Sequence, residues 1–223
     1  MKNPELLIFD VNETLLDMTP LKESINKALE NELAFDIWFP TLLQYSLVES
    51  ITKEYQDFSK IAAATFKMIA QKFGFDFSDK EIEEILSPIK KLKPHPEVVE
   101  ALSLLKKNNF KMIALTNGKP EVAKAQLQFA EIDGFFDEVL SVELVKRYKP
   151  HLKTYKYVLD KYAVSEEKVM MIAAHGWDIA GAQRARLQTA FISRSGKFEY
   201  PLADKPTVIG PDLLSIAKSL LSA

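Results

Sequence analysis

The sequence predicts an α/β fold with a doubly wound, mostly parallel sheet and an inserted helical cap domain. Short apolar runs rich in branched residues alternate with longer stretches of helical periodicity, as they do in βαβ units. This alternation stops between residues 16 and 92, where only helical patterning continues. The runs predicted to be strands are Leu6–Phe9, Lys111–Leu115, Glu138–Leu140, Val169–Ile172, Thr189–Ile192 and Thr207–Ile209.

A helical domain inserted after the first strand accounts for the interruption. Pro94 and Pro96 lie close together where the strand rhythm resumes, and they favour an extended return to the sheet. We therefore predict a core domain of residues 1–15 and 93–223 and a helical cap domain of residues 16–92.

Local signals place several of the helices. Residues 78–81, Ser-Asp-Lys-Glu, fit a capping box at a helix start, and Gly74 is suited to end the preceding helix. Residues 96–107 have proline in the first turn and apolar side chains on one face, so they predict a helix. The same spacing predicts a helix over residues 154–162.

Composition excludes several classes of function. The 223 residues carry 29 basic and 31 acidic side chains without a basic block, so we expect no nucleic-acid partner. There is no cysteine, which excludes disulfides, thiolate nucleophiles and Cys-ligated zinc. Neither a signal peptide nor an apolar run long enough to span a membrane is visible, so we expect a cytoplasmic protein with no membrane partner.

Polar residues that follow the predicted strands are the candidates for a functional site. In open parallel sheets, ligands bind at the carboxyl ends of the strands, and these ends meet at one edge. The four segments found there are Phe9-Asp10-Val11-Asn12-Glu13-Thr14-Leu15, Leu115-Thr116-Asn117-Gly118, Lys146-Arg147-Tyr148-Lys149-Pro150 and Ala173-Ala174-His175-Gly176-Trp177-Asp178.

Each of these residues also has a purely structural interpretation. Asp10 alone could be a turn or cap residue, and Thr116-Asn117-Gly118 is an ordinary turn sequence. Lys149 could be a solvated lysine, and Asp178 suits the first turn of a helix because of the helix dipole. Their occurrence in this order, each at the same sheet edge, favours a single site.

The residue types fit covalent catalysis by a carboxylate. A carboxylate is a competent nucleophile at neutral pH when it is partly desolvated and held by a cation and by hydroxyl or amide donors. We assign that role to Asp10, with Lys149 keeping it ionised and Thr14 and Thr116 as donors. Asp178 would orient Lys149 or help to activate the water that releases the product.

The ordered segments resemble the four motifs of the haloacid dehalogenase superfamily. The matching residues are Phe9-Asp10-x-Asn12-x-Thr14-Leu15, Thr116-Asn117-Gly118, Lys149-Pro150 and His175-x-Trp177-Asp178-x-x-Gly181-Ala182. The chain is most similar to the type II (L-2-haloacid) dehalogenase branch. That resemblance implies a Rossmann-like core with a cap, and a homodimer. It also implies that Asp10 displaces halide with inversion, without a metal, and that water hydrolyses the aspartyl ester to a 2-hydroxy acid.

Two positions set the chain apart from the phosphatase branch of the same superfamily. That branch has a second aspartate as general acid where this chain has Asn12, and asparagine cannot donate a proton as a carboxylic acid does. It also has a further metal-binding acid where this chain has Ala174. If the chain were a phosphatase, the ligands remaining for Mg²⁺ would be Asp10, the backbone carbonyl of Asn12 and Asp178.

Other positions depart from the type II pattern. The resemblance implies an arginine near the halide in the cap, but the matching residue in this chain is Phe39. In the fourth motif, this chain has Ala173 and His175 at positions where the family often has Ser and Asn. Tyr155 matches a tyrosine that the family places in the pocket. His175 is either a helix-entry imidazole bonded to the backbone or an active-site donor or base. Trp177 either packs at a helix start or lines the pocket.

Three functions remain open at this point: a metal-independent hydrolase of small 2-haloacids, a Mg²⁺-dependent phosphatase, and a non-catalytic binder of a small-molecule carboxylate. The candidate catalytic residues are Asp10, Thr14, Thr116, Asn117, Lys149, His175 and Asp178. The candidate substrate-binding residues are Val11, Asn12, Phe39, Tyr45, Gly118, Tyr155 and Trp177. No cofactor is required under the first hypothesis.

Overall fold

A parallel sheet forms the centre of the molecule in the computed structural model, which describes residues 3–222. Within these residues the sheet has six strands in the order β3-β2-β1-β4-β5-β6. The strands are β1 (Leu6–Phe9), β2 (Lys111–Thr116), β3 (Glu138–Ser141), β4 (Val169–Ala173), β5 (Gln188–Ile192) and β6 (Val208–Gly210). The predicted strands and the predicted fold class are confirmed, and each strand end agrees to within one residue.

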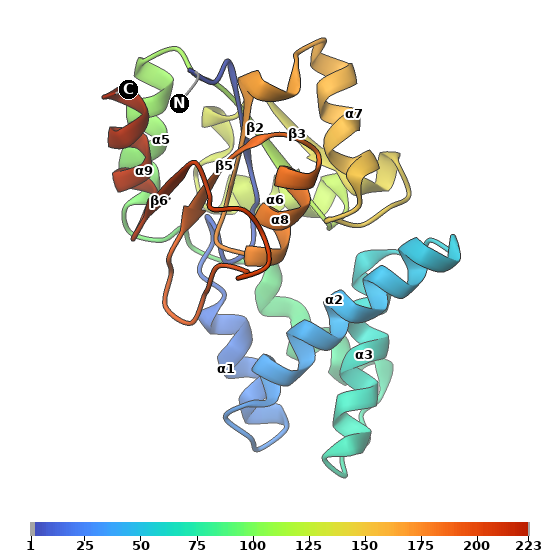
Figure 1. Ribbon diagram of the computed structural model, residues 1–223. Helices are drawn as coiled ribbons and strands as arrows, with labels where there is room; N and C mark the ends of the chain where they lie inside the picture. Colours follow the sequence, from blue (N-terminus) through green and yellow to red (C-terminus); the bar gives the residue numbers. More distant parts are fainter. Residues whose placement is uncertain (1–2, 223) are drawn as a thin grey trace.

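Helices cover both faces of the sheet (Figure 1). On one face lie α5 (Val98–Lys107), α6 (Pro120–Phe129) and α9 (Leu213–Leu221), and on the other lie α7 (Leu152–Tyr162) and α8 (Gly176–Arg184). Leu7 and Phe9 of β1 point into the first layer, whereas Leu6 and Ile8 point into the second. Side chains that alternate between two buried faces explain why the strands read as continuous apolar runs.

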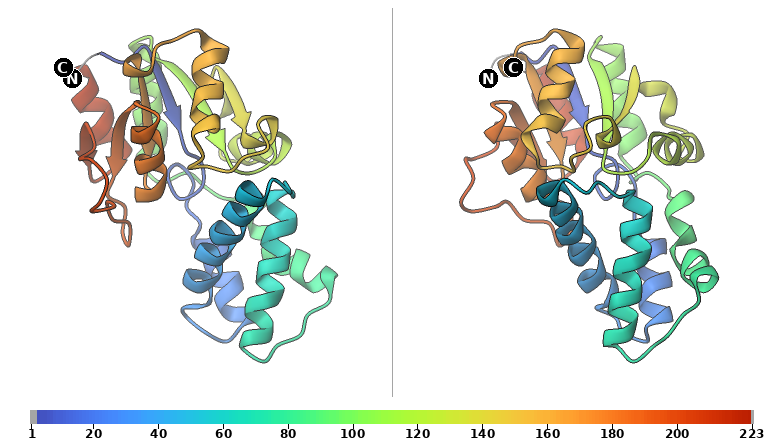
Figure 2. Two further views of the ribbon diagram at one scale, coloured as in Figure 1. Left: turned by 45° about the vertical axis from the view of Figure 1, so that its right-hand side comes forward. Right: turned by 90° about the vertical axis from the view of Figure 1, so that its right-hand side faces the viewer.

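The inserted segment folds into helices that lie beyond the sheet edge (Figure 2). These helices are α1 (Thr19–Ala28), α2 (Ala34–Thr52), α3 (Phe58–Lys72) and α4 (Asp79–Leu86), followed by a 3₁₀ turn at Ser87–Lys90. The capping box at Ser78 and Glu81 is confirmed, since each side chain bonds the other residue's backbone amide. Gly74 ends the α3 region with a φ of 85°, a left-handed conformation that glycine adopts without strain.

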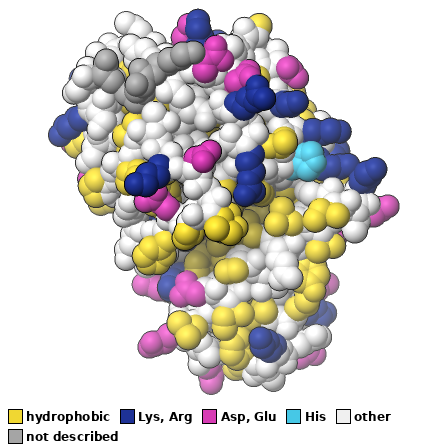
Figure 3. Space-filling model, in the orientation of Figure 1, with side chains coloured by type: hydrophobic (Ala, Val, Ile, Leu, Met, Phe, Trp, Pro, Cys, Tyr) yellow, Lys and Arg dark blue, Asp and Glu magenta, His cyan; other side chains and the backbone are white. Residues whose placement is uncertain are grey.

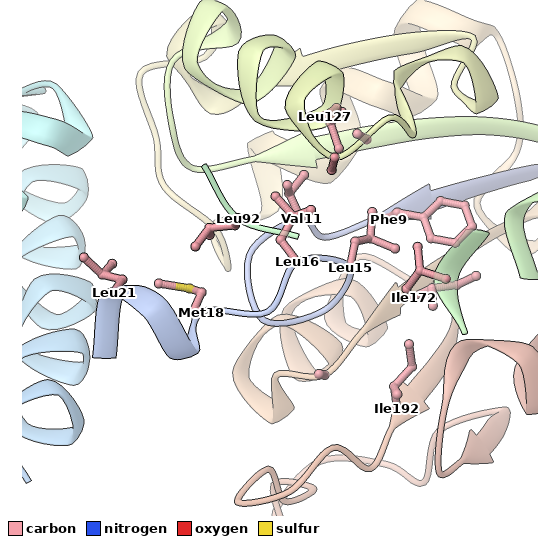
Figure 4. Packing of buried hydrophobic residues seen from close by; sticks show 14 of the residues in the cluster. Phe9, Val11, Leu15, Leu16, Met18, Leu21, Leu92, Leu127, Ile172 and Ile192 are labelled. Atoms are coloured by element: carbon pink, nitrogen blue, oxygen red, sulfur yellow. The ribbon is translucent and has the colours of Figure 1, made fainter. Parts of the chain in front are cut away.

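The chain leaves and re-enters the core along two adjacent segments. Leu16 and Pro94 form an antiparallel bridge, and the amide of Asp17 donates to the carbonyl of Lys93 at 2.9 Å. Apolar packing continues through this junction, from Phe9 on β1 to Leu21 on α1 (Figure 4). The helical domain therefore rests on the edge of the sheet where the strands end.

None of the helices between residues 3 and 222 combines the length and apolar character that a membrane crossing requires. The predicted domain boundaries, residues 1–15 and 93–223 for the core and 16–92 for the cap, stay a prediction.

Candidate active site

Asp10 stands directly after β1, with its amide bonded to the carbonyl of Ile172 in the neighbouring strand at 3.1 Å. Its side chain is 9% exposed. Both carboxylate oxygens have donors: the ammonium of Lys149 lies 2.8 Å from Oδ1, and the hydroxyl of Thr14 lies 2.7 Å from Oδ2. The carboxylate is thus sheltered from solvent and held in one orientation.

Lys149 connects two carboxylates that follow different strands, β1 and β4. Its Nζ atom donates to Asp10 Oδ1 at 2.8 Å, to Asp178 Oδ2 at 2.7 Å and to the carbonyl of Leu115 at 3.0 Å. These three bonds use all the protons of the ammonium group. The side chain is completely buried. Burial alone would lower the pKa of Lys149, but the charges of Asp10 and Asp178 raise it overall, so the group is an ammonium ion.

Asp178 lies in the first turn of α8 and is fully buried. Its Oδ1 atom accepts from the hydroxyl of Tyr155 at 2.5 Å, and its Oδ2 atom accepts from Lys149. Burial and the charge of Asp10 raise the pKa of Asp178, although Lys149 acts in the opposite direction. Gly181 permits this packing, because a Cβ atom there would lie 2.7 Å from the Tyr155 hydroxyl.

His175, just before α8, lies between two carboxylates. Its Nδ1 atom is 2.9 Å from Asp10 Oδ2, and its Nε2 atom is 2.7 Å from Glu13 Oε2. Burial would lower the pKa of His175, but the bonds to Asp10 and Glu13 outweigh it and raise the pKa to about 9. The ring is therefore an imidazolium that donates from both nitrogens. Its bonds are to side chains, so the interpretation as a backbone-bonded helix-entry residue is wrong.

The charges around Asp10 control its ionisation. Burial would raise the pKa of Asp10, but the positive charges of Lys149 and His175 hold it well below its ordinary range. Asp10 is consequently ionised at neutral pH. Such a carboxylate can attack an electrophilic carbon without a separate base.

The segment after β2 shapes the loop around Lys149. The Asn117 Oδ1 atom accepts from the backbone amide of Lys149 at 2.9 Å, and the hydroxyl of Ser141 donates to the carbonyl of Gly118 at 2.6 Å. We expected Thr116 to donate to Asp10, and this expectation is corrected. Its Oγ1 atom instead accepts from the amide of Gly118 at 3.0 Å, because the chain turns there.

Several residues predicted to bind substrate lie around this centre. The ring of Phe39, on α2, is 6.1 Å from the ring of His175, and the ring of Trp177 stacks on His175 at 5.0 Å. Asn12 Oδ1 accepts from Gln126 at 3.1 Å and borders the boundary between core and helical domain. Phe39 thus brings an apolar surface of the helical domain to the site.

Three of the predicted substrate contacts are corrected. The side chain of Val11 is fully buried, and its carbonyl accepts from the amides of Leu15 and Leu16, so it holds the loop. Tyr155 is fully buried and contacts Asp178 rather than open space. Tyr45, 36% exposed, lies beyond Phe39 along α2 and borders none of the cavities described below.

Phe39 borders three cavities. One of about 830 Å³ is bordered by Glu13, Phe39 and Lys197, and one of about 510 Å³ by His175, Trp177 and the same Phe39 and Lys197. A third, of about 420 Å³, runs between Asn12 and the apolar side of α2 and α3. On the face drawn in Figure 3, hydrophobic side chains gather along this boundary between sheet and helices.

The donor set does not fit a magnesium ion. Lys149 already lies between Asp10 and Asp178, and Tyr155 takes the other oxygen of Asp178. Thr14 and His175 hold the other oxygen of Asp10, so a metal would have to displace at least one of these donors. Among residues 3–222, no group of three or more His, Cys, Asp or Glu side chains is arranged to hold a metal.

Glu13 and Lys197 belong to this site but were not among the predicted residues. Glu13 Oε1 lies 2.6 Å from Lys197 Nζ, and its other oxygen contacts His175. Lys197 follows β5, so applying the strand-end rule to the fifth strand would have identified it. Glu13 lies inside the first segment, between two residues that were selected.

Comparison with known proteins finds a matching family model and similar sequences. Residues 4–186 match a family model described as haloacid dehalogenase-like hydrolase. The chain is 25% identical over 199 residues to haloacetate dehalogenase H-2 of Moraxella sp. (strain B), covering 88% of each protein. It is also 25% identical over 191 residues to (S)-2-haloacid dehalogenase 4A of Burkholderia cepacia, covering 85% of this chain and 83% of the relative.

A solved structure has the same fold. It is the L-2-haloacid dehalogenase from Xanthobacter autotrophicus with chloropropionic acid covalently bound. The TM-score is 0.90 at 21% identity, and the match covers 98% of each chain. This similarity includes both the sheet and the inserted helices.

Proposed function

The chain belongs to the haloacid dehalogenase-like hydrolase family, and from that membership we propose that it hydrolyses small (S)-2-haloacids through an ester of Asp10. The observation that supports this proposal most directly is the buried contact of Asp10 with Lys149, which also binds Asp178. Relatives at 25% identity that dehalogenate haloacetate and (S)-2-haloacids support the choice of substrate class.

In the first step a carboxylate oxygen of Asp10 attacks the second carbon of the acid from the side opposite the halogen. The new carbon–oxygen bond forms as the carbon–halogen bond breaks, so the configuration inverts and halide carries the charge away. Lys149 and His175 keep Asp10 ionised before attack. The aromatic surface of Phe39 and Trp177 excludes water, which favours displacement at carbon.

In the second step water attacks the side-chain carbonyl carbon of the ester. The tetrahedral oxyanion is stabilised by donors already in place, namely Lys149, Thr14 and His175. Asp178 keeps an anionic partner beside Lys149 while Asp10 is neutral, and it is the carboxylate that can take up the proton lost by the water. Collapse releases the 2-hydroxy acid and restores Asp10.

The proposed reaction has a direct chemical test. We expect halide release from (S)-2-chloropropionate but not from the R enantiomer, and its loss in Asp10→Asn. The exposed Asp160, on α7, provides a matched Asp160→Asn control that should keep full activity. A single turnover in water labelled with heavy oxygen should put the label into Asp10 rather than into the product. Label in the product would exclude the ester.

The other two functions give different results in the same experiments. Turnover of p-nitrophenyl phosphate that requires both Mg²⁺ and Asp10 would support a phosphatase. Binding of a carboxylate without any turnover, unchanged in Asp10→Asn, would support a non-catalytic binder. Location in the cytoplasm and assembly as a homodimer stay predictions.

A further inference from the structure

We propose that the substrate of this site carries a second carboxylate, and that this group binds Lys197 and His175 in the place now held by the side chain of Glu13. The inference rests on the proposed function and narrows its substrate class to 2-halogenated dicarboxylic acids of four or more carbons. In this reaction the first carboxylate is adjacent to the attacked carbon, and the second lies at the far end of the molecule.

Glu13 occupies its position as a bound carboxylate would. One oxygen is 2.7 Å from Nε2 of His175, and the other is 2.6 Å from Nζ of Lys197. Charge-assisted bonds to both oxygens are typical of carboxylate recognition. A ligand carboxylate placed there would make the same two bonds.

Only the side chain of Glu13 has to move for this exchange. Its amide donates to the carbonyl of Leu16 at 3.0 Å, and its carbonyl is 3.2 Å from Nε2 of His95. The backbone has a φ of 61°, which these bonds help to hold. Glu13 borders the cavity of about 830 Å³, so its side chain has open space to enter.

The cations are accessible from the cavities. Lys197 borders both the 830 Å³ and the 510 Å³ cavities, and its side chain is 24% exposed. Phe39 borders the same two cavities and lies 6.0 Å from Nζ of Lys197. An aliphatic chain between two carboxylates can therefore contact an apolar wall while its far end reaches the cations.

The spacing sets a minimum length for the substrate. One imidazole ring and two hydrogen bonds separate Asp10 Oδ2 from Glu13 Oε2, which places these oxygens about 7 Å apart. An attacked carbon lies about 3 Å from its nucleophile. Because the His175 ring lies between these two oxygens, at least about 4 Å remains from the attacked carbon to the second carboxylate oxygen, which is a span of three or more bonds. A carboxylate adjacent to the attacked carbon is too close to reach Lys197.

Binding of unreactive acids tests the inference without turnover. Calorimetric titration should give succinate a Kd about tenfold lower than butanoate, which has the same chain length and one carboxylate. Lys197→Gln should remove this preference. Glu13→Gln removes the internal competitor and should tighten succinate several-fold.

Lys22 provides a matched control, because it borders the same 830 Å³ cavity and pairs with Asp36 at 2.8 Å. Lys22→Gln should leave the preference unchanged. Equal affinity for succinate and butanoate, an unaltered preference in Lys197→Gln, or an equal loss in Lys22→Gln would overturn the inference. Lys197 lies on a partly exposed loop, so this variant remains informative even if Glu13→Gln does not fold.

Turnover separates this inference from the proposed function. If the proposed reaction and the dicarboxylate site are both correct, kcat/KM for halide release should be higher with 2-chlorosuccinate than with 2-chlorobutanoate. This difference should be lost in Lys197→Gln. Halide release from both acids at equal rates would leave the proposed reaction intact and refute the dicarboxylate site. Selective succinate binding without halide release would support the site and refute the reaction.

Discussion

Replacing His175 with glutamine should remove a decline in stability that the wild-type protein shows between pH 6.5 and 9. Burial would lower the pKa of this imidazole, but its bonds to Asp10 and Glu13 raise the pKa from 6.5 to about 9. The folded protein thus holds the proton more tightly than the unfolded chain. This stabilisation is fully present below pH 6.5 and is lost as the pH rises through 9.

The size of the effect follows from the difference between the two pKa values. Because one pKa unit corresponds to about 1.4 kcal/mol, the contribution is about 3 kcal/mol of unfolding free energy. The same contacts lower the pKa of Glu13, and they help to lower that of Asp10. These shifts describe one set of interactions, so their energies are not added.

Urea unfolding followed by circular dichroism, from about pH 6 to about pH 9.5, measures this contribution. The wild-type free energy of unfolding should fall by about 3 kcal/mol relative to the His175→Gln variant. The other histidines, His95 and His151, have pKa values lowered by burial, so neither can cause a decline in this range. The variants His95→Gln and His151→Gln should therefore keep the decline in stability. Parallel curves for wild type and His175→Gln would refute the assignment of an imidazolium.

Three further predictions concern the same network. Lys149→Met should abolish halide release and lower the free energy of unfolding by about 3–5 kcal/mol, since Asp10 and Asp178 lose their shared cation; denaturant titration measures the loss. Tyr155→Phe leaves one oxygen of Asp178 without its donor, so kcat should fall at nearly constant KM. The free energy of unfolding should fall by about 1–3 kcal/mol. Tyr148→Phe removes a hydrogen bond to a carbonyl of the helical domain and should cost about 1 kcal/mol, visible as a lower Tm, without changing the halide-release pH profile.

The strands could be predicted from sequence because both faces of the sheet are covered. A strand such as Val169–Ala173 must be apolar at every position, which distinguishes it from the amphipathic helices around it. The helix predicted over residues 96–107 begins at Val98 instead, because Pro96 and Glu97 form the turn that precedes it. Helix boundaries depend on such local turns, which sequence periodicity does not resolve.

The centre of the site could be predicted because parallel strands end at one edge. Asp10, Lys149 and Asp178 follow different strands, and the sheet brings them within hydrogen-bonding distance. Side-chain direction could not be predicted in the same way. Tyr155 matched a pocket residue but points at Asp178, and Tyr45, on α2, is 36% exposed and borders none of the three cavities. Those outcomes depend on helix rotation and tertiary packing.

The bridge between Leu16 and Pro94 brings the two ends of the inserted segment side by side. A segment with adjoining ends can be exchanged for one of another length without altering the spacing of the strands, since a short turn could close the same gap. Asp10 and its charged partners Lys149 and Asp178 lie wholly outside the exchangeable part. The apolar wall that Phe39 contributes can therefore be changed without altering the charged centre, and grafting a different lid onto this sheet is a route to new specificity.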